Sequence, residues 1–98
     1  MTERYSFTSS LWRWAARKDA WFFLTVPPDI SDEIEAIPRP PRGFGGVRVE
    51  VTVGRTTWQT SIFPGGDGYV LPMKRAVLKK EGIEEGDLVD VTVELVSS

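Results

Sequence analysis

One pattern occurs twice in this chain: a short apolar strand ending in proline, a short helix, a loop, and a strand of alternating valines or leucines. In the first copy these parts are residues 22–28, 29–37 and, after the loop, 47–53. In the second copy they are residues 69–72, 73–81 and 88–95. Two such halves predict a small, closed, pseudo-symmetric β-barrel, because closure removes the exposed edges that a small open sheet would leave.

The strands are expected from alternation and from short apolar runs. Residues 47–53 alternate most cleanly, with four valines on one face, which is typical of a half-buried strand. Gly54 and Arg55 then fit a two-residue hairpin loop with glycine where φ is positive. Residues 4–14 alternate loosely and are expected to form the first strand. Residues 21–26 are almost wholly apolar, which predicts a strand that is buried on both faces or curved into a barrel wall.

Two short helices are expected between these strands. Asp29 is the candidate N-cap of the first helix, because its carboxylate can accept hydrogen bonds from first-turn amides. The apolar face of this helix is made of Ile30, Ile34 and Ile37. Pro72 is expected to begin the second helix, and Gly82 to end it in the left-handed conformation. The sequence thus predicts a mainly β fold of about six or seven strands with two short helices, in one domain spanning residues 1–98.

Neither cysteine nor histidine occurs among the 98 residues. The missing cysteines exclude disulfides and thiolate metal ligands. The missing histidines exclude the usual zinc sites and the nucleophile systems that depend on a histidine base, so Thr60 and Ser61 have no such partner. We therefore expect a protein that is not an enzyme, with no catalytic residues, no metal and no cofactor.

The net charge of −2 argues against a dedicated nucleic-acid-binding protein, although the charges are unevenly distributed. The second helix carries a basic cluster, Lys74, Arg75, Lys79 and Lys80, whereas the first carries an acidic set, Asp29, Asp32, Glu33 and Glu35. Such runs also occur as ordinary solvated helix faces. With no apolar stretch of transmembrane length and no signal peptide, we expect a cytoplasmic protein.

Several motifs together carry a family resemblance. They are residues 11–14, 21–27, 42–49, 56–64, 69–74, 82–83 and 86–87. Over roughly residues 5 to 95 the chain resembles the bacterial and archaeal family catalogued as domain of unknown function 1905 (DUF1905). The resemblance implies a double-split β-barrel, in agreement with the internal duplication. The family has no established biochemical role, so it implies no catalytic residues.

A second resemblance concerns the fold of one half only. Residues 71–74 and 82–89 look like the half-barrel of AbrB- and MazE-type DNA-binding proteins, in which two chains form the barrel. A symmetric DNA-binding surface needs basic residues in both copies. The first half of this chain is acidic where the second is basic, so it departs from that pattern.

The candidate ligand-binding residues combine aromatic rings and cations: Trp21, Arg42, Arg48, Trp58 and Lys74. The tryptophans can form a stacking wall for a flat ligand or simply pack in the core. Trp21 and Trp58 begin strands in equivalent regions of the two halves, so both are placed near one barrel end. The arginines can bind an anion or pair with acidic neighbours, and Lys74 can bind an anion or form a salt bridge.

We interpret the chain as a non-catalytic DUF1905-type domain that binds a small ligand or a protein partner, as a monomer or a weak homodimer. The alternative is nucleic-acid binding through the basic second helix, with Lys74, Arg75, Lys79 and Lys80 as the candidate residues. A third hypothesis is an enzyme that uses Lys74 or a carboxylate as acid–base, which a strongly perturbed pKa in a cleft would reveal.

Overall fold

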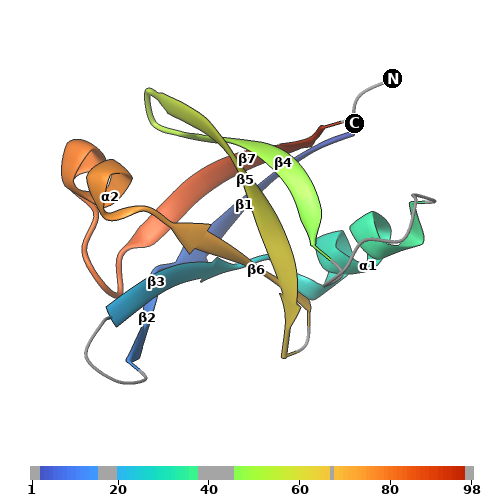
Figure 1. Ribbon diagram of the computed structural model, residues 1–98, viewed down its shortest axis with the longest axis horizontal. Coiled ribbons are helices and arrows are strands. Elements are labelled where there is room, and N and C mark those ends of the chain that lie inside the picture. The colour runs from blue at the N-terminus through green and yellow to red at the C-terminus, as the bar shows by residue number, and fades with distance from the viewer. Residues whose placement is uncertain (1–2, 16–19, 38–45, 67, 97–98) are drawn as a thin grey trace.

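The structure is a computed structural model that describes residues 3–15, 20–37, 46–66 and 68–96. In chain order its elements are β1 (Arg4–Ser10), β2 (Trp12–Ala15), β3 (Ala20–Thr25), α1 (Pro28–Ala36), β4 (Val47–Val53), β5 (Thr56–Gly65), β6 (Gly68–Met73), α2 (Arg75–Glu81) and β7 (Leu88–Leu95). The strands form one sheet, in the order β1-β7-β4-β5-β6-β3-β2, which curls into a half-barrel (Figure 1). The predicted mainly β fold, with seven strands and two helices, is confirmed.

The core fills the inside of this curled sheet. All four valines of β4 are buried, as the alternation predicts, and the buried set on β7 is Val89, Val91 and Val93. Val51 and Val93 lie directly opposite one another across the β4–β7 pair, and both are fully buried. Each buried valine contributes about 1.5–3 kcal/mol relative to an exposed one, so this double row anchors the barrel.

Strand β5 makes the sheet curl by changing partners along its length. From Thr56 to Ile62 it pairs with β4, and from Phe63 to Gly65 it pairs with β6. The β5–β6 pairs end at Val70, whereas β6 continues to Met73 as the partner of β3. Strands β5 and β6 therefore diverge at one end of the barrel.

The two edge strands of the sheet, β1 and β2, are consecutive in the chain. The expected single strand over residues 4–14 is wrong: Leu11 separates β1 from β2. Leu11 is buried, and its backbone pairs with the turn before β7 by donating to Asp87 O and accepting from Gly86 N. Ser9 Oγ, on β1, donates to the Thr25 carbonyl of β3 at 2.9 Å. The predicted closed, double-split form is not confirmed by this single curled half-barrel sheet.

Strand β3 is buried on one face only and forms part of the curled sheet, so of the two expected alternatives burial on both faces is wrong and a strand in a curved wall is confirmed. Leu24 is fully buried on the inner face, while Trp21 is 56% exposed on the outer one. The outer face carries the aromatic rings of Trp21 and Phe23 before the polar Thr25, which is why most of the run looks apolar in the sequence.

The helices lie on opposite sides of the half-barrel (Figure 1). Helix α1 begins at Pro28, with Pro27 as its N-cap and no side-chain cap, so the expected Asp29 cap is wrong. The fixed φ of proline already suits a first helical position, and the cap therefore lies two residues earlier than expected. Ile34 is fully buried and Ile30 is half-buried, which confirms the apolar face.

Helix α2 begins later than expected. Pro72 lies in β6 opposite Phe23, and Lys74 is the N-cap, so the prediction that Pro72 begins the helix is wrong. Since β5 has already left β6 at this point, no strand on that side requires a hydrogen bond from the Pro72 nitrogen. Gly82 ends the helix with φ 67° as predicted, and Ile83 N–H donates back to Leu78 O at 2.9 Å.

One buried hydroxyl joins α1 to the end of β3 and the beginning of β6. Ser31 is 2% exposed; its Oγ donates to the Val26 carbonyl at 3.2 Å and accepts from Tyr69 N–H at 3.0 Å. Beside it, Val26 N–H donates to Tyr69 O at 2.9 Å. Gly68 is required here, because a Cβ at that position would collide with the Ser31 hydroxyl. Ser31 thus fixes where β3 ends and β6 begins.

At the other side of the barrel, the end of α2 holds the β4–β5 hairpin. Glu81 Oε2 accepts from Thr56 Oγ1 at 2.6 Å and from Arg55 N–H at 3.4 Å. Gly54 has φ +59°, as the predicted hairpin requires, and a Cβ there would run into the Glu81 carboxylate.

We expect Ser31→Ala to lower the free energy of unfolding by about 1–3 kcal/mol, because two buried backbone groups lose a partner. Urea denaturation measures the loss. The matched control is Ser6→Ala, which removes an exposed hydroxyl bonded to Thr92 at 2.9 Å and should change stability by no more than about 0.5 kcal/mol. Equal stability of Ser31→Ala and the parent protein would contradict the structural role of this hydroxyl.

We expect Gly54→Ala to destabilise the protein more than Gly66→Ala. Both glycines have positive φ, which costs an alanine roughly 1–2 kcal/mol, but only at Gly54 does the new methyl group also meet the Glu81 carboxylate. Adding Glu81→Ala should bring the penalty at Gly54 down to that at Gly66. A penalty that stays the same in this double-mutant cycle, measured by urea denaturation, would show that Glu81 does not crowd the turn.

Candidate functional site

A groove lies where β5 and β6 diverge, at the start of α2. Its volume is about 480 Å³, and its lining residues are Ala20, Trp21, Phe22, Thr60, Pro72, Met73, Lys74 and Arg75. We call it the β3–α2 groove. The partner change of β5 creates it, since Thr60 no longer has a β6 residue as its strand partner. A volume of this size lies within the range of about 300–1,000 Å³ that is usual for small-molecule sites.

The groove combines an aromatic wall with two cations. Trp21 projects from the outer face of β3, and Phe22 from its inner face beside Met73. Lys74 and Arg75 are both exposed at the junction of β6 and α2. Arg75 Nη2 donates to the Ala20 carbonyl at 3.1 Å, which holds the guanidinium beside the first residues of β3. The groove can therefore stack a flat ring and neutralise a negative charge.

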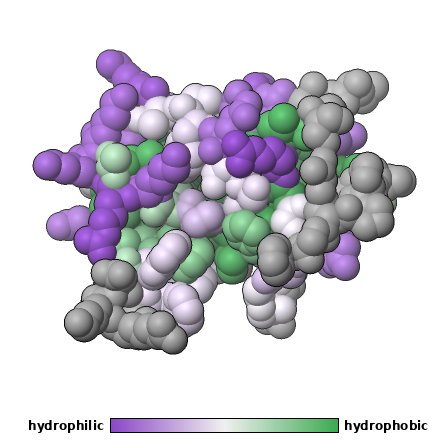
Figure 2. Space-filling model, viewed as in Figure 1, coloured by the Kyte–Doolittle hydropathy of each residue, from purple (hydrophilic) through white to green (hydrophobic). Residues whose placement is uncertain are grey.

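A second depression, of about 530 Å³, adjoins the groove and shares Phe22 and Arg75 with it. Its other lining residues are Arg13, Leu78, Lys79, Ile83, Glu84 and Glu85. Both signs of charge occur here, whereas the described residues that line the β3–α2 groove include no acid. Figure 2 shows hydrophilic side chains projecting around the α2 end, with hydrophobic surface between them. Because acidic residues line the second depression and none of the described residues lining the groove is acidic, an anion would be favoured in the groove.

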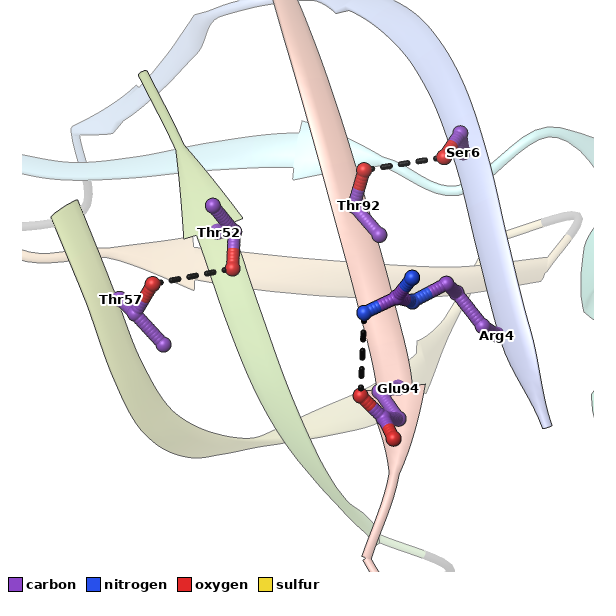
Figure 3. Close-up of polar contacts among 6 residues, drawn as sticks. All are labelled: Arg4, Ser6, Thr52, Thr57, Thr92 and Glu94. Atoms are coloured by element: carbon purple, nitrogen blue, oxygen red, sulfur yellow. Dashed lines mark hydrogen bonds and ion pairs between the residues drawn. The ribbon is translucent and has the colours of Figure 1, made fainter. Parts of the chain in front are cut away.

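The two cations of the groove have no acidic partner among the described residues. The ion pair found in that part of the chain joins Arg4 and Glu94, at 3.6 Å on the opposite wall (Figure 3). The salt bridge considered for Lys74 is thus absent within the same residues.

A comparison with protein-family models identifies the chain over residues 7–93. The match is to DUF1905, a domain of unknown function. The chain belongs to the DUF1905 family. This confirms the family expected from the sequence motifs. No curated protein matches the chain.

Of the residues predicted to bind a ligand, this DUF1905 domain brings Trp21 and Lys74 together in the groove. Trp58 is elsewhere: it is half-buried on the inner face of β5 and packs against the core. Its Nε1 is buried without a hydrogen-bond partner among the described residues. Arg48 is exposed on β4, opposite Ser61. Arg42 lies outside the described residues.

The basic cluster of the DUF1905 domain is divided between the two hollows. Lys74 and Arg75 line the groove, Lys79 lines the adjoining depression, and Lys80 is exposed and lines neither. The sequence analysis missed Arg13, Phe22, Thr60 and Met73 as lining residues. Their roles depend on strand register and on the divergence of β5, and no local motif encodes either.

The hypothesis of acid–base catalysis gains no support from the groove. The pKa of Tyr5 is raised above its usual value by burial, with the nearby charges of Glu3 and Glu33 adding to the effect. Tyr5 lies on β1, opposite Val93, and does not line the groove.

Within the described ranges, no group of three or more acidic side chains is placed to hold a metal ion. No helix there has the length and apolar character needed to cross a membrane.

Proposed function

We propose that this DUF1905 domain is a non-catalytic binding module whose β3–α2 groove takes a small ligand with a flat ring and a negative charge. The observation that carries the proposal is the position of Trp21 beside Lys74 and Arg75, around one hollow of suitable size. The ring would stack on the indole, and the anionic group would meet the two cations. Because Ala20 O already orients Arg75, little side-chain entropy remains to be lost on binding.

A protein partner is the second form of the same proposal. Trp14 and Trp21 are 53% and 56% exposed, and exposed aromatic residues are enriched in protein interfaces. A partner would insert an aromatic or acidic side chain into the groove. The monomeric or weakly dimeric state, the cytoplasmic location and the bacterial origin stay predictions.

The second candidate function is binding of duplex DNA by the basic face of α2. The observation that favours it is the exposure of all four cations of the cluster, Lys74, Arg75, Lys79 and Lys80. The acidic residues of α1 are exposed as well, on the opposite side of the half-barrel, so only one half of the domain presents a basic helix. This asymmetry places DNA second.

The double-split form and the internal duplication are part of this proposal. They are supported by the pairing of β3 with β6 and of β4 with β7, both antiparallel. Helix α1 connects β3 to β4, and helix α2 connects their respective partners, β6 and β7. A two-fold axis relating the halves would require these pairings.

We expect 2-naphthoate, a flat aromatic carboxylate, to bind in the groove and its neutral analogue 2-naphthylmethanol to bind more weakly. Amide NMR shifts should be confined to residues that line the groove. Lys74→Gln and Arg75→Gln should each weaken binding roughly two- to fivefold, since each removes one exposed charge contact. Arg55→Gln, which removes an exposed cation that lines neither hollow, is the control and should have no effect. Shifts centred elsewhere, or equal binding of the two compounds, would refute the proposal.

For the DNA candidate we expect the double variant Lys79→Glu/Lys80→Glu to lose duplex binding while 2-naphthoate binding is retained. Duplex binding should also fall steeply with salt, because neutralised phosphates release their counterions. A titration with random-sequence duplex at low and moderate salt checks both points. If the double variant binds duplex as the parent does, α2 is not a DNA-binding helix.

A further inference from the structure

The two outer walls of the half-barrel differ in chemistry. Across β1, β7, β4 and β5 runs a row of hydroxyl residues that lie directly opposite one another: Ser6, Thr92, Thr52 and Thr57 (Figure 3). Ser6 and Thr92 are hydrogen-bonded at 2.9 Å, and Thr52 and Thr57 at 3.0 Å. This wall satisfies its own polar groups and presents an ordinary soluble surface.

The opposite wall, made by β2 and β3, is aromatic. Trp14 lies opposite Trp21, and Trp12 lies opposite Phe23 in the next pair but one. The Trp12–Phe23 pair is packed: the two rings are stacked with centroids 5.0 Å apart, and Trp12 Nε1 donates to Thr25 Oγ1 at 2.9 Å. The Trp14–Trp21 pair is open, with more than half of each residue exposed. We call Trp14 and Trp21 the tryptophan platform.

Cations adjoin this platform on one side. The β3–β6 register pairs Phe22 with Met73, so the next position along each strand sets Trp21 beside Lys74. Trp21, Lys74 and Arg75 line the same groove, and neither cation is ion-paired within the described chain. Exposed aromatic faces next to unpaired cations are the arrangement used to bind single-stranded nucleic acid, in which bases stack and phosphates meet lysine or arginine.

We propose that the tryptophan platform and the β3–α2 groove together bind a nucleotide unit of a single-stranded nucleic acid, with a base stacked on Trp21 and its phosphate at Lys74 and Arg75. The inference rests on the proposed function and names its ligand. A paired base cannot reach the platform, because both of its faces are already stacked in a duplex. Trp14 provides a second ring for the neighbouring base.

The test measures fluorescence anisotropy of a labelled oligothymidylate of about eight nucleotides, a length suited to one small β-barrel. We expect the single strand to bind. A hairpin whose paired stem has the same length should bind more weakly, and thymidine monophosphate should bind only weakly. Affinity should fall with salt at a log–log slope of about −0.7 for each phosphate contacted.

Trp21→Ala should weaken oligothymidylate binding at least about fivefold, through loss of one stacked base. Trp21→Phe should retain most of the affinity, because the ring remains. Leu88→Ala removes another exposed apolar side chain, on β7, that lines neither the groove nor the adjoining depression, and should change nothing. Preserved amide NMR spectra confirm that each variant is folded.

The outcomes separate this inference from the function on which it rests. If 2-naphthoate binds in the groove but neither oligothymidylate nor thymidine monophosphate does, the nucleotide inference is overturned and the proposed function stands. If the duplex binds as well as the single strand, or Trp21→Ala leaves affinity unchanged, stacking on the platform is refuted. If no compound binds, both proposals fail.

Discussion

The Ser31 hydroxyl fixes the register on which the rest of the barrel depends. By bonding both Val26 O and Tyr69 N–H, it sets the end of β3 against the beginning of β6. A shift of one residue in this register would turn every inward side chain of the pair outward. The same register places Trp21 next to Lys74 at the other end of the two strands. A buried contact at α1 therefore determines the composition of a groove beside α2.

Those parts of the fold that depend on local periodicity could be predicted from the sequence, and those that depend on tertiary context could not. The valines of β4, the hairpin at Gly54 and the cap at Gly82 each follow from a short pattern with one physical cause. The start of α2 could not be predicted from a local pattern, because a proline that can begin a helix can equally lie near the end of a strand from which the neighbouring strand has diverged. The break at Leu11 depends on hydrogen bonds to a turn more than seventy residues later in the chain.

The candidate site divides in the same way. Trp21 and Lys74 could be proposed from residue type alone, since an indole and an unexplained cation are each plausible ligand contacts. Pairing Trp21 with Trp58 by internal symmetry failed: Trp21 lines the groove from the outer face of β3, whereas Trp58 packs against the core and does not line it. Thr60 lies on the same inner face of β5 as Trp58, two residues nearer to the point where β5 joins β6, and it lines the groove. Inner or outer placement changes with every residue, so an approximate equivalence between two strands cannot decide it.

The contrast between the outer walls supports the proposal that the aromatic wall serves binding. The hydroxyl row shows that outward positions in this barrel accept small polar residues whose hydrogen bonds are satisfied across the strands. On β2 and β3, the rings of Trp12 and Phe23 stack on one another. The open indoles of Trp14 and Trp21 add exposed apolar surface beyond this pair, which favours association with something outside the domain. On that proposal the partner would be anionic, because Lys74 and Arg75 have no acidic partner among the described residues and an apolar partner alone would have to desolvate both charges without compensation.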